Sequence, residues 1–314
     1  MILSVSRRTD VPALYSDRFF DKLKKGEVLI PNPFISGGKT ARVRLLPFTI
    51  ETNILGSVEV SGNIEGIVFW TKNPAPMLGR MDELKGIPYY FQFTLNPYGK
   101  EYESNLPSLE NRVRTFIELT KFCPVMWRYD PIFLSKSITV DWHLEQFEKL
   151  AKRLNGSAKI CIINTLIGRH GDAYCPSAAD TLKIAEGFVR IGKQYGIEIK
   201  SCAEIIDLSC VGVKPAKCID PEVFERLIGY KVKKSKLKGK SRSGCNCMES
   251  IDIGAYDTCT NGCIYYYAKK GAKKSLADNP DGEIYDRKTE QIITTPLKCQ
   301  QEINLLLDKL ILGD

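Results

Sequence analysis

The sequence predicts an α/β fold in which about six parallel strand–helix units form a partial or complete (β/α) barrel of the TIM type. Two observations carry this prediction. Short apolar runs typical of buried strands alternate with helical patterns, which favours repeated strand–helix units. No glycine-rich dinucleotide fingerprint follows the first apolar run, Ile2–Ser6, which favours a barrel over a doubly wound sheet. The 314 residues suffice for one large domain of this kind.

The elements follow in order along the chain. The predicted strands are the apolar runs Ile2–Ser6, Ile67–Trp70, Tyr89–Leu95, Val125–Tyr129, Lys159–Leu166 and Ile197–Ala203. The predicted helices begin near Ser16 and then cover Leu109–Cys123, Val140–Leu154, Ala178–Tyr195, Pro221–Ile228 and Ile292–Leu312. Ser108 stands where an N-cap is expected. Early in the chain, Val28–Pro33 and Ala41–Leu46 predict a hairpin outside these units.

Three segments result. We expect the barrel over residues 1–229, a basic linker with a cysteine-cluster loop packed on the barrel over 230–270, and a C-terminal loop and helix over 271–314. Most of the formal net charge of +8 lies in Lys231–Arg242, which holds six lysines, one arginine and no acid. One interpretation of this run is a solvated linker, and the other is contact with the phosphate backbone of a nucleic acid.

The composition predicts neither a membrane protein nor an exported one. No apolar run reaches the length of a membrane span, and the first residues lack the pattern of a signal peptide. The odd number of cysteines, eleven, argues for reduced thiols and against a disulfide scaffold. We expect a cytoplasmic monomer without a membrane partner.

Polar side chains follow the predicted strands at the points where the strands end, which is where β/α barrels carry their chemistry. The candidates for cofactor binding are Arg8, Asp10, Thr71, Asn73 and Arg128, and the candidates for catalysis are Lys72, Asp130 and Glu204. The cations suit a carboxylate or phosphate, and the acids suit an amine, a hydroxyl or a proton transfer. Each residue alone is equally well explained by an ion pair or a loop hydrogen bond. Their shared position at one barrel mouth favours a ligand site.

The densest chemical signal is a group of cysteines near the C-terminus. Cys245 and Cys247 stand shortly before Cys259 and Cys263, and thiolates grouped this closely bind a metal or are redox-active. No histidine pair follows them at the spacing of a zinc finger. The sequence therefore predicts a metal centre built on thiolates.

Some other cysteines and the two histidines are better explained by structural or subsidiary roles. Cys123 and Cys161 are typical of apolar fillers, and His143 begins a helix as a structural residue. His170 follows a strand and is a loop residue near the mouth, and Cys218 is a spare ligand.

The stretch Tyr256-x-x-Cys259-x-x-Gly262-Cys263-x-Tyr265-Tyr266-Tyr267-Ala268 resembles the cluster loop of the radical-SAM superfamily, in particular the branch that contains spore photoproduct lyase. In that loop, three cysteines spaced Cys-x3-Cys-x2-Cys hold a 4Fe–4S cluster whose fourth iron binds S-adenosylmethionine. The resemblance thus implies an iron–sulfur enzyme. By analogy with the lyase, it also implies a nucleic-acid substrate.

A second stretch, Trp70–Pro74, resembles a strand end of the same branch, although the cluster loop comes last here. The chain therefore resembles a circularly permuted member, with Glu249–Ala255 as the strand that carries the loop and docks at the barrel edge. Residues 1–270 also resemble a bacterial family, domain of unknown function 1848. That resemblance implies a β/α barrel with a cysteine cluster and names no substrate.

One position departs from the loop pattern, because Tyr266 stands where the third cysteine is expected. Three outcomes remain open. Cys245, Cys247 or Cys202 supplies the missing thiolate, or the site has decayed. Alternatively, the four C-terminal cysteines close a structural site for zinc or a fully ligated cluster, in a barrel without catalytic activity.

Overall fold

The computed structural model describes residues 2–31, 40–44, 49–52, 58–61, 64–232 and 245–268. The predicted helix Ile292–Leu312, the segment 271–314 and most of the basic run Lys231–Arg242 lie outside the described residues.

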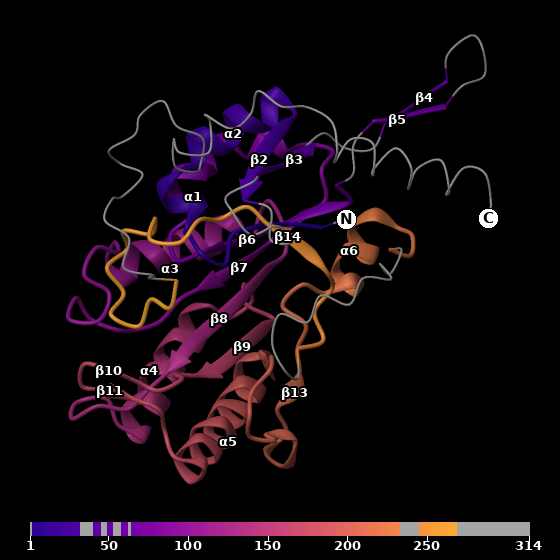
Figure 1. Cartoon of the computed structure of the whole chain (residues 1–314). Coiled ribbons are helices and arrows are strands. Elements are labelled where there is room, and N and C mark those ends of the chain that lie inside the picture. Colours follow the sequence, from indigo (N-terminus) through magenta and orange to yellow (C-terminus); the bar gives the residue numbers. More distant parts are fainter. Residues whose placement is uncertain are drawn as a thin grey trace.

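A sheet of eight parallel strands forms the centre of the molecule (Figure 1). Its spatial order is β13-β12-β9-β8-β7-β6-β1-β14. The strands are β1 (Ile2–Val5), β6 (Gly66–Thr71), β7 (Tyr89–Thr94), β8 (Val125–Ile132), β9 (Ile160–Thr165), β12 (Glu198–Ser201), β13 (Lys214–Pro215) and β14 (Ser250–Asp252). The predicted parallel α/β fold is confirmed. Among the described strands the sheet stays open, with β13 and β14 as its edges, so no closed barrel forms.

The last strand of the sheet lies beside the first. Ser250 is opposite Ile2, and Asp252 is opposite Ser4, in parallel register. Every other neighbouring pair in the sheet follows chain order, so β14 is the one strand that returns to the start. This places the predicted strand Glu249–Ala255 at the sheet edge.

The strands alternate their side chains between two apolar layers, because successive residues of a strand point to opposite faces. Leu3, Phe69 and Phe91 pack into the layer beneath most of the helices. Ile2, Val68 and Tyr90 pack into the opposite layer with Phe224 of helix α6 (Pro221–Ile228).

The helices pack their apolar faces into these layers, and several of them begin and end at recognisable caps. They are α1 (Val11–Leu14), α2 (Ser16–Lys25), the 3₁₀ helices η1 (Ala75–Leu84) and η2 (Ser209–Val211), α3 (Leu109–Leu119), α4 (Val140–Arg153), α5 (Ala178–Tyr195) and α6 (Pro221–Ile228). The hydroxyl of Ser108 accepts a hydrogen bond from the backbone of Asn111, as predicted for an N-cap. Gly196 ends α5 in the left-handed region that favours glycine.

Small antiparallel pairs complete the described fold. They are β2 (Glu27–Pro31) with β3 (Thr40–Arg44), β4 (Thr49–Thr52) with β5 (Val58–Ser61), and β10 (Arg169–His170) with β11 (Ala173–Tyr174). The first pair confirms the predicted hairpin. Within the described ranges, none of the helices combines the length and apolarity needed to cross a membrane.

Candidate metal centre at the strand ends

A cavity of about 610 Å³ opens at the carboxyl ends of the parallel strands. Most of the residues predicted at strand ends line it: Arg8, Asp10, Thr71, Lys72, Arg128, Asp130 and Glu204. The predicted metal ligands line it too: Cys202, Cys245, Cys247, Cys259 and Cys263. Asn73 is not among the lining residues, and its backbone N–H donates to the hydroxyl of Thr71. The shared position of these groups follows from the parallel sheet, because all its strands end at one edge.

The cysteine loop reaches this cavity because β14 docks beside β1. Asp252, at the end of β14, accepts hydrogen bonds from the hydroxyls of Ser4 and Ser6 and from the backbone of Arg7. The chain then turns back over the strand ends, so that Cys259 and Cys263 both face the cavity.

Asp10 fastens that loop to the sheet. Its Oδ2 accepts from the backbone N–H of Lys72 at 2.8 Å and from the side-chain amide of Asn261 at 2.8 Å. Its Oδ1 accepts from the backbone of Ala13. Burial raises the pKa of Asp10, while these hydrogen bonds act in the opposite direction. The predicted cofactor ligand is therefore engaged by the protein itself.

Tyr266, at the position of the absent third cysteine, also acts as an anchor. Its hydroxyl donates to the carbonyl of Arg8 at 2.7 Å, and the neighbouring Tyr267 donates to the carbonyl of Arg7. Burial raises the pKa of Tyr266, and its hydroxyl is engaged in this hydrogen bond.

A buried ionic network lies directly below the loop. Nζ of Lys72 is 2.7 Å from Oε1 of Glu103, and Nη1 of Arg112 is 3.3 Å from Oε2 of the same carboxylate. The hydroxyl of Tyr265 also donates to Glu103. Burial alone would raise the pKa of Glu103, but the charges of Lys72 and Arg112 outweigh it and lower the net pKa. Lys72, predicted as catalytic, is thus held in an ion pair.

The two loop thiols sit in a poorly solvated environment. Burial raises the pKa of Cys263 to about 12 and also raises that of Cys259. The charge of Lys72 lowers both values. Ionising both thiols therefore requires an additional cation beside them.

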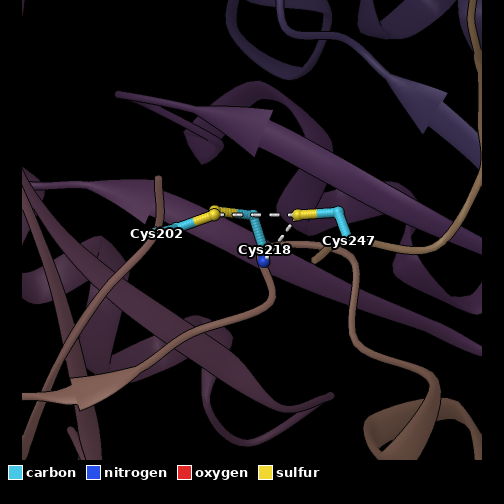
Figure 2. Close-up of side chains that lie close together, drawn as sticks. All are labelled: Cys202, Cys218 and Cys247. Atoms are coloured by element: carbon cyan, nitrogen blue, oxygen red, sulfur yellow. Dashed lines mark hydrogen bonds between the residues drawn. The ribbon is translucent and has the colours of Figure 1, made fainter. Parts of the chain in front are cut away.

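Three other cysteines of the cavity lining converge on one another. Cys202 follows β12, Cys218 precedes α6, and Cys247 precedes β14, and their sulfur atoms all lie within 4.8 Å of one another. Figure 2 shows the three sulfurs pointing toward one another from separate segments. Cys259 and Cys263 are not members of this group. We call Cys202, Cys218 and Cys247 the thiol triad.

Arg128 connects the thiol triad to the strand ends. Its Nη1 donates to Sγ of Cys218 at 3.0 Å, and its Nη2 contacts the carboxylate of Asp130 and the amide oxygen of Asn164. The thiols of Cys202 and Cys247 and this guanidinium lower the pKa of Cys218. One sulfur of the triad is therefore the favoured site of negative charge.

The remaining predicted residues have clear surroundings. Glu204 accepts from the backbone and the hydroxyl of Thr165. His143 is fully buried between Tyr129 and the carbonyl of Phe133, which fits its structural interpretation. Cys161 is buried in the core with Cys123 packed against the same layer, as expected of fillers, and His170 lines the cavity.

Several residues of the site were not found from the sequence. Glu103 and Asn261 lie in loops, where no strand end marks them. Cys218, predicted only as a spare ligand, stands two residues before the N-cap Asp220, and its grouping with Cys202 and Cys247 emerges only in the fold.

Comparison with known proteins gives one family and a limited structural similarity. The family model "Domain of unknown function (DUF1848)" matches residues 2–268. Two solved variants of spore photoproduct lyase, with a cysteine replaced by serine in one and by alanine in the other, are 16% identical in sequence, with TM-scores of 0.33 and 0.34. Each alignment covers 42% of this chain and 49% of the lyase, so the chain spans about half the length of these structures. The search of curated proteins gives no match.

Proposed function

The chain belongs to the family of the domain of unknown function DUF1848, and from its site we propose that it is a radical-SAM-like iron–sulfur enzyme. The supporting observation is the path of β14, which brings Cys259 and Cys263 into the same cavity as the polar strand ends. The Cys-x3-Cys spacing of these two residues resembles the radical-SAM loop. Bound there, a 4Fe–4S cluster would supply one-electron reduction of S-adenosylmethionine.

The donor chemistry of the loop fits such a cluster at two positions, because iron–sulfur clusters are held by cysteine thiolates. Tyr266 does not fit the third, since its protonated hydroxyl is engaged with Arg8. Of the three substitutes predicted, Cys202 and Cys247 are grouped with Cys218. Cys245 lines the cavity without belonging to that group, and we assign it as the third thiolate.

The remaining strand-end groups suit a charged, polar ligand. Arg8 lies against Tyr256, with its guanidinium carbon 5.0 Å from the ring centre, and faces the cavity, where it can bind a carboxylate. Arg128, fixed by Asp130 and Asn164, presents a second buried positive charge. Thr71 contributes to the same lining, and Asp130 and Glu204 remain our candidates for proton transfer.

Metal analysis of anaerobically purified protein tests the proposal. We expect brown protein with about four irons per chain, and an electron paramagnetic resonance signal that S-adenosylmethionine perturbs. Cys259→Ser and Cys263→Ser should each lose most of the iron. Cys210→Ser, which changes an exposed thiol, is the matched control and should keep it. Unchanged iron in both loop variants would refute the proposal.

A rescue experiment tests the third ligand. Cys245→Ser should lose the cluster, and adding Tyr266→Cys to that variant should restore it by completing the loop pattern. If Cys245→Ser binds iron like the wild type, Cys245 is not the ligand. The circular dichroism spectrum of each variant separates loss of ligand from loss of fold.

The second candidate function is a protein without catalytic activity, in which Cys245, Cys247, Cys259 and Cys263 hold a structural zinc ion or a fully ligated iron–sulfur cluster. Tyr266, at the position of the third loop cysteine, favours it. A structural zinc ion at these four cysteines predicts colourless protein without iron, and a fully ligated iron–sulfur cluster predicts brown protein. In neither case does S-adenosylmethionine change the spectrum. The same purification therefore decides between the two candidates.

We further propose that the basic run Lys231–Arg242 contacts the phosphates of a nucleic acid. Its six lysines and one arginine give the charge that such contacts need. Duplex binding should weaken steeply as salt rises, and replacing the six lysines by glutamine should flatten that dependence. Binding that stays constant with salt would contradict the proposal.

A further inference from the structure

The geometry points to a second metal site, separate from the cysteine loop, in which the thiol triad of Cys202, Cys218 and Cys247 binds a single tetrahedral zinc ion. This inference does not depend on the proposed function, because the triad contains neither Cys259 nor Cys263.

The spacing of the sulfurs selects one ion over a cluster. A tetrahedral zinc ion with bonds of about 2.3 Å holds its sulfur ligands about 3.8 Å apart. Sγ of Cys202 is 3.8 Å from Sγ of Cys247, and all three sulfurs lie within 4.8 Å of one another. In a 4Fe–4S cluster each thiolate binds a different iron, which requires the sulfurs to stand farther apart. The triad has the dimensions of a mononuclear site.

The backbone around the triad is fixed from below by the sheet. The carbonyl of Cys218 accepts from the hydroxyl of Tyr90 at 2.8 Å and from the amide of Gln92 at 2.7 Å. The carbonyl of Cys202 accepts from the side-chain amide of Asn164 at 2.6 Å. The segments that carry two of the three ligands are thus held in place before a metal arrives, which is what a site of defined geometry needs.

Cys247 is fastened to Cys218 directly. The backbone N–H of Cys218 donates to Sγ of Cys247 at 3.1 Å, and the N–H of Met248 donates to the carbonyl of Ile219 at 2.9 Å. An N–H pointed at a sulfur stabilises the thiolate form, which is the form that binds metal.

Charge balance also favours a divalent cation. Three thiolates in largely buried positions carry three negative charges, which burial disfavours unless cations lie beside them. A zinc ion offsets two of these charges. The guanidinium of Arg128, 3.0 Å from Sγ of Cys218, adds a positive charge beside the thiolates that it shares with the carboxylate of Asp130. All three cysteines line the cavity, so the fourth position of the ion faces that space and remains available to a water or a substrate atom.

Zinc analysis of the full chain, purified with a reductant and without chelator, tests this site. We expect one zinc ion per chain, lost in Cys202→Ser, Cys218→Ser and Cys247→Ser. Cys210→Ser should retain it as the matched control. The double variant Cys259→Ser/Cys263→Ser should also retain zinc while it loses iron, so the two proposals can fail separately.

Cobalt(II) provides a readout that does not depend on how the protein was purified. Titration of metal-free protein with Co²⁺ should give the absorption of a tetrahedral thiolate site, absent from the triad variants. Arg128→Met should lower the affinity of the site for zinc about 10- to 100-fold, and the cobalt spectrum should remain that of a tetrahedral site. Three outcomes would each overturn the inference: unchanged zinc in all three triad variants, loss of iron instead of zinc from them, or a Cys202–Cys247 disulfide that persists in metal-free protein prepared with a reductant. Circular dichroism identifies a variant that fails only because it is unfolded, and the cobalt titration of the wild-type chain then decides.

Discussion

The side-chain amide of Asn261 donates to Oδ2 of Asp10 at 2.8 Å and so joins the cysteine loop to the turn that follows the first strand. The same oxygen accepts from the backbone of Lys72 at the end of β6. One carboxylate therefore ties the cysteine loop to the ends of β1 and β6, and the loop thiols depend on it for their position.

Removal of this carboxylate should loosen the loop. We expect Asp10→Asn to lower the free energy of unfolding by about 1–3 kcal/mol, because an amide places donors against N–H groups that need an acceptor. Iron content should fall in parallel. Urea denaturation and iron analysis measure both effects, with Asp21→Asn on the exposed side of α2 as the control. Equal urea midpoints for Asp10→Asn and the wild type would show that the contact does not hold the loop.

Glu103→Gln should destabilise the protein strongly, because it leaves Lys72 and Arg112 buried without their counter-charge. Loss of one partner of a buried ion pair costs about 3–5 kcal/mol. Glu110→Gln, which breaks the exposed pair with Arg153, should cost less than about 1 kcal/mol. Chemical denaturation of both variants at neutral pH measures the difference, and similar losses would mean that the network contributes little.

The same network predicts an acid-sensitive stability. The pKa of Glu103 is lowered in the folded protein from 4.5, so its contribution is complete above the pKa of the unfolded chain. That contribution is lost as the pH falls through the lowered folded value. The difference in unfolding free energy between wild type and Glu103→Gln should therefore shrink in strong acid. A constant difference would contradict the assignment.

His143 should add a second pH dependence over a milder range. Burial lowers its pKa from 6.5 to about 4, so the unfolded chain binds a proton that the folded chain excludes between these values. The contribution of neutral His143 to the free energy of unfolding is fully present above pH 6.5. It is lost as the pH drops toward 4, by about 3 kcal/mol in total. His143→Gln should flatten this part of the profile in urea unfolding from about pH 7 to about pH 5. An unchanged slope of the profile in His143→Gln would refute the prediction.

Gly262 lies between the two loop cysteines at a φ of +72°, the left-handed region that favours glycine. A Cβ there would also collide with the hydroxyl oxygen of Ser104. We expect Gly262→Ala to cost about 1–3 kcal/mol of stability and to reduce iron loading. Gly79→Ala, where a Cβ has nothing within 4 Å, is the control. Differential scanning calorimetry compares the two, and an unshifted melting temperature for Gly262→Ala would count against this account of the loop.

The sequence predicted the parts of the site that follow from periodicity. Arg128 and Asp130 were found because they continue an apolar strand, and a parallel sheet brings strand ends together. Asp10 was also predicted, as a residue that binds a cofactor. In the structure its Oδ2 instead accepts a hydrogen bond from Asn261, near the end of the described chain. Residues that meet only through the fold leave no local pattern in the sequence. The grouping of the thiol triad is the strongest case. The sequence predicted Cys202 and Cys247 as ligands and Cys218 as a spare one, but not that these three meet, since they come from three separate loops.

The seam between β1 and β14 has a consequence for how the protein is made. Ser4 donates a hydrogen bond to Asp252, so β1 pairs with a strand that is translated 248 residues later. The nascent chain can assemble the middle of the sheet during synthesis, but its edge strand and the thiol-lined cavity arrive only afterwards. Under the proposed function, the loop can accept its iron only after β14 has been synthesised and has paired with β1.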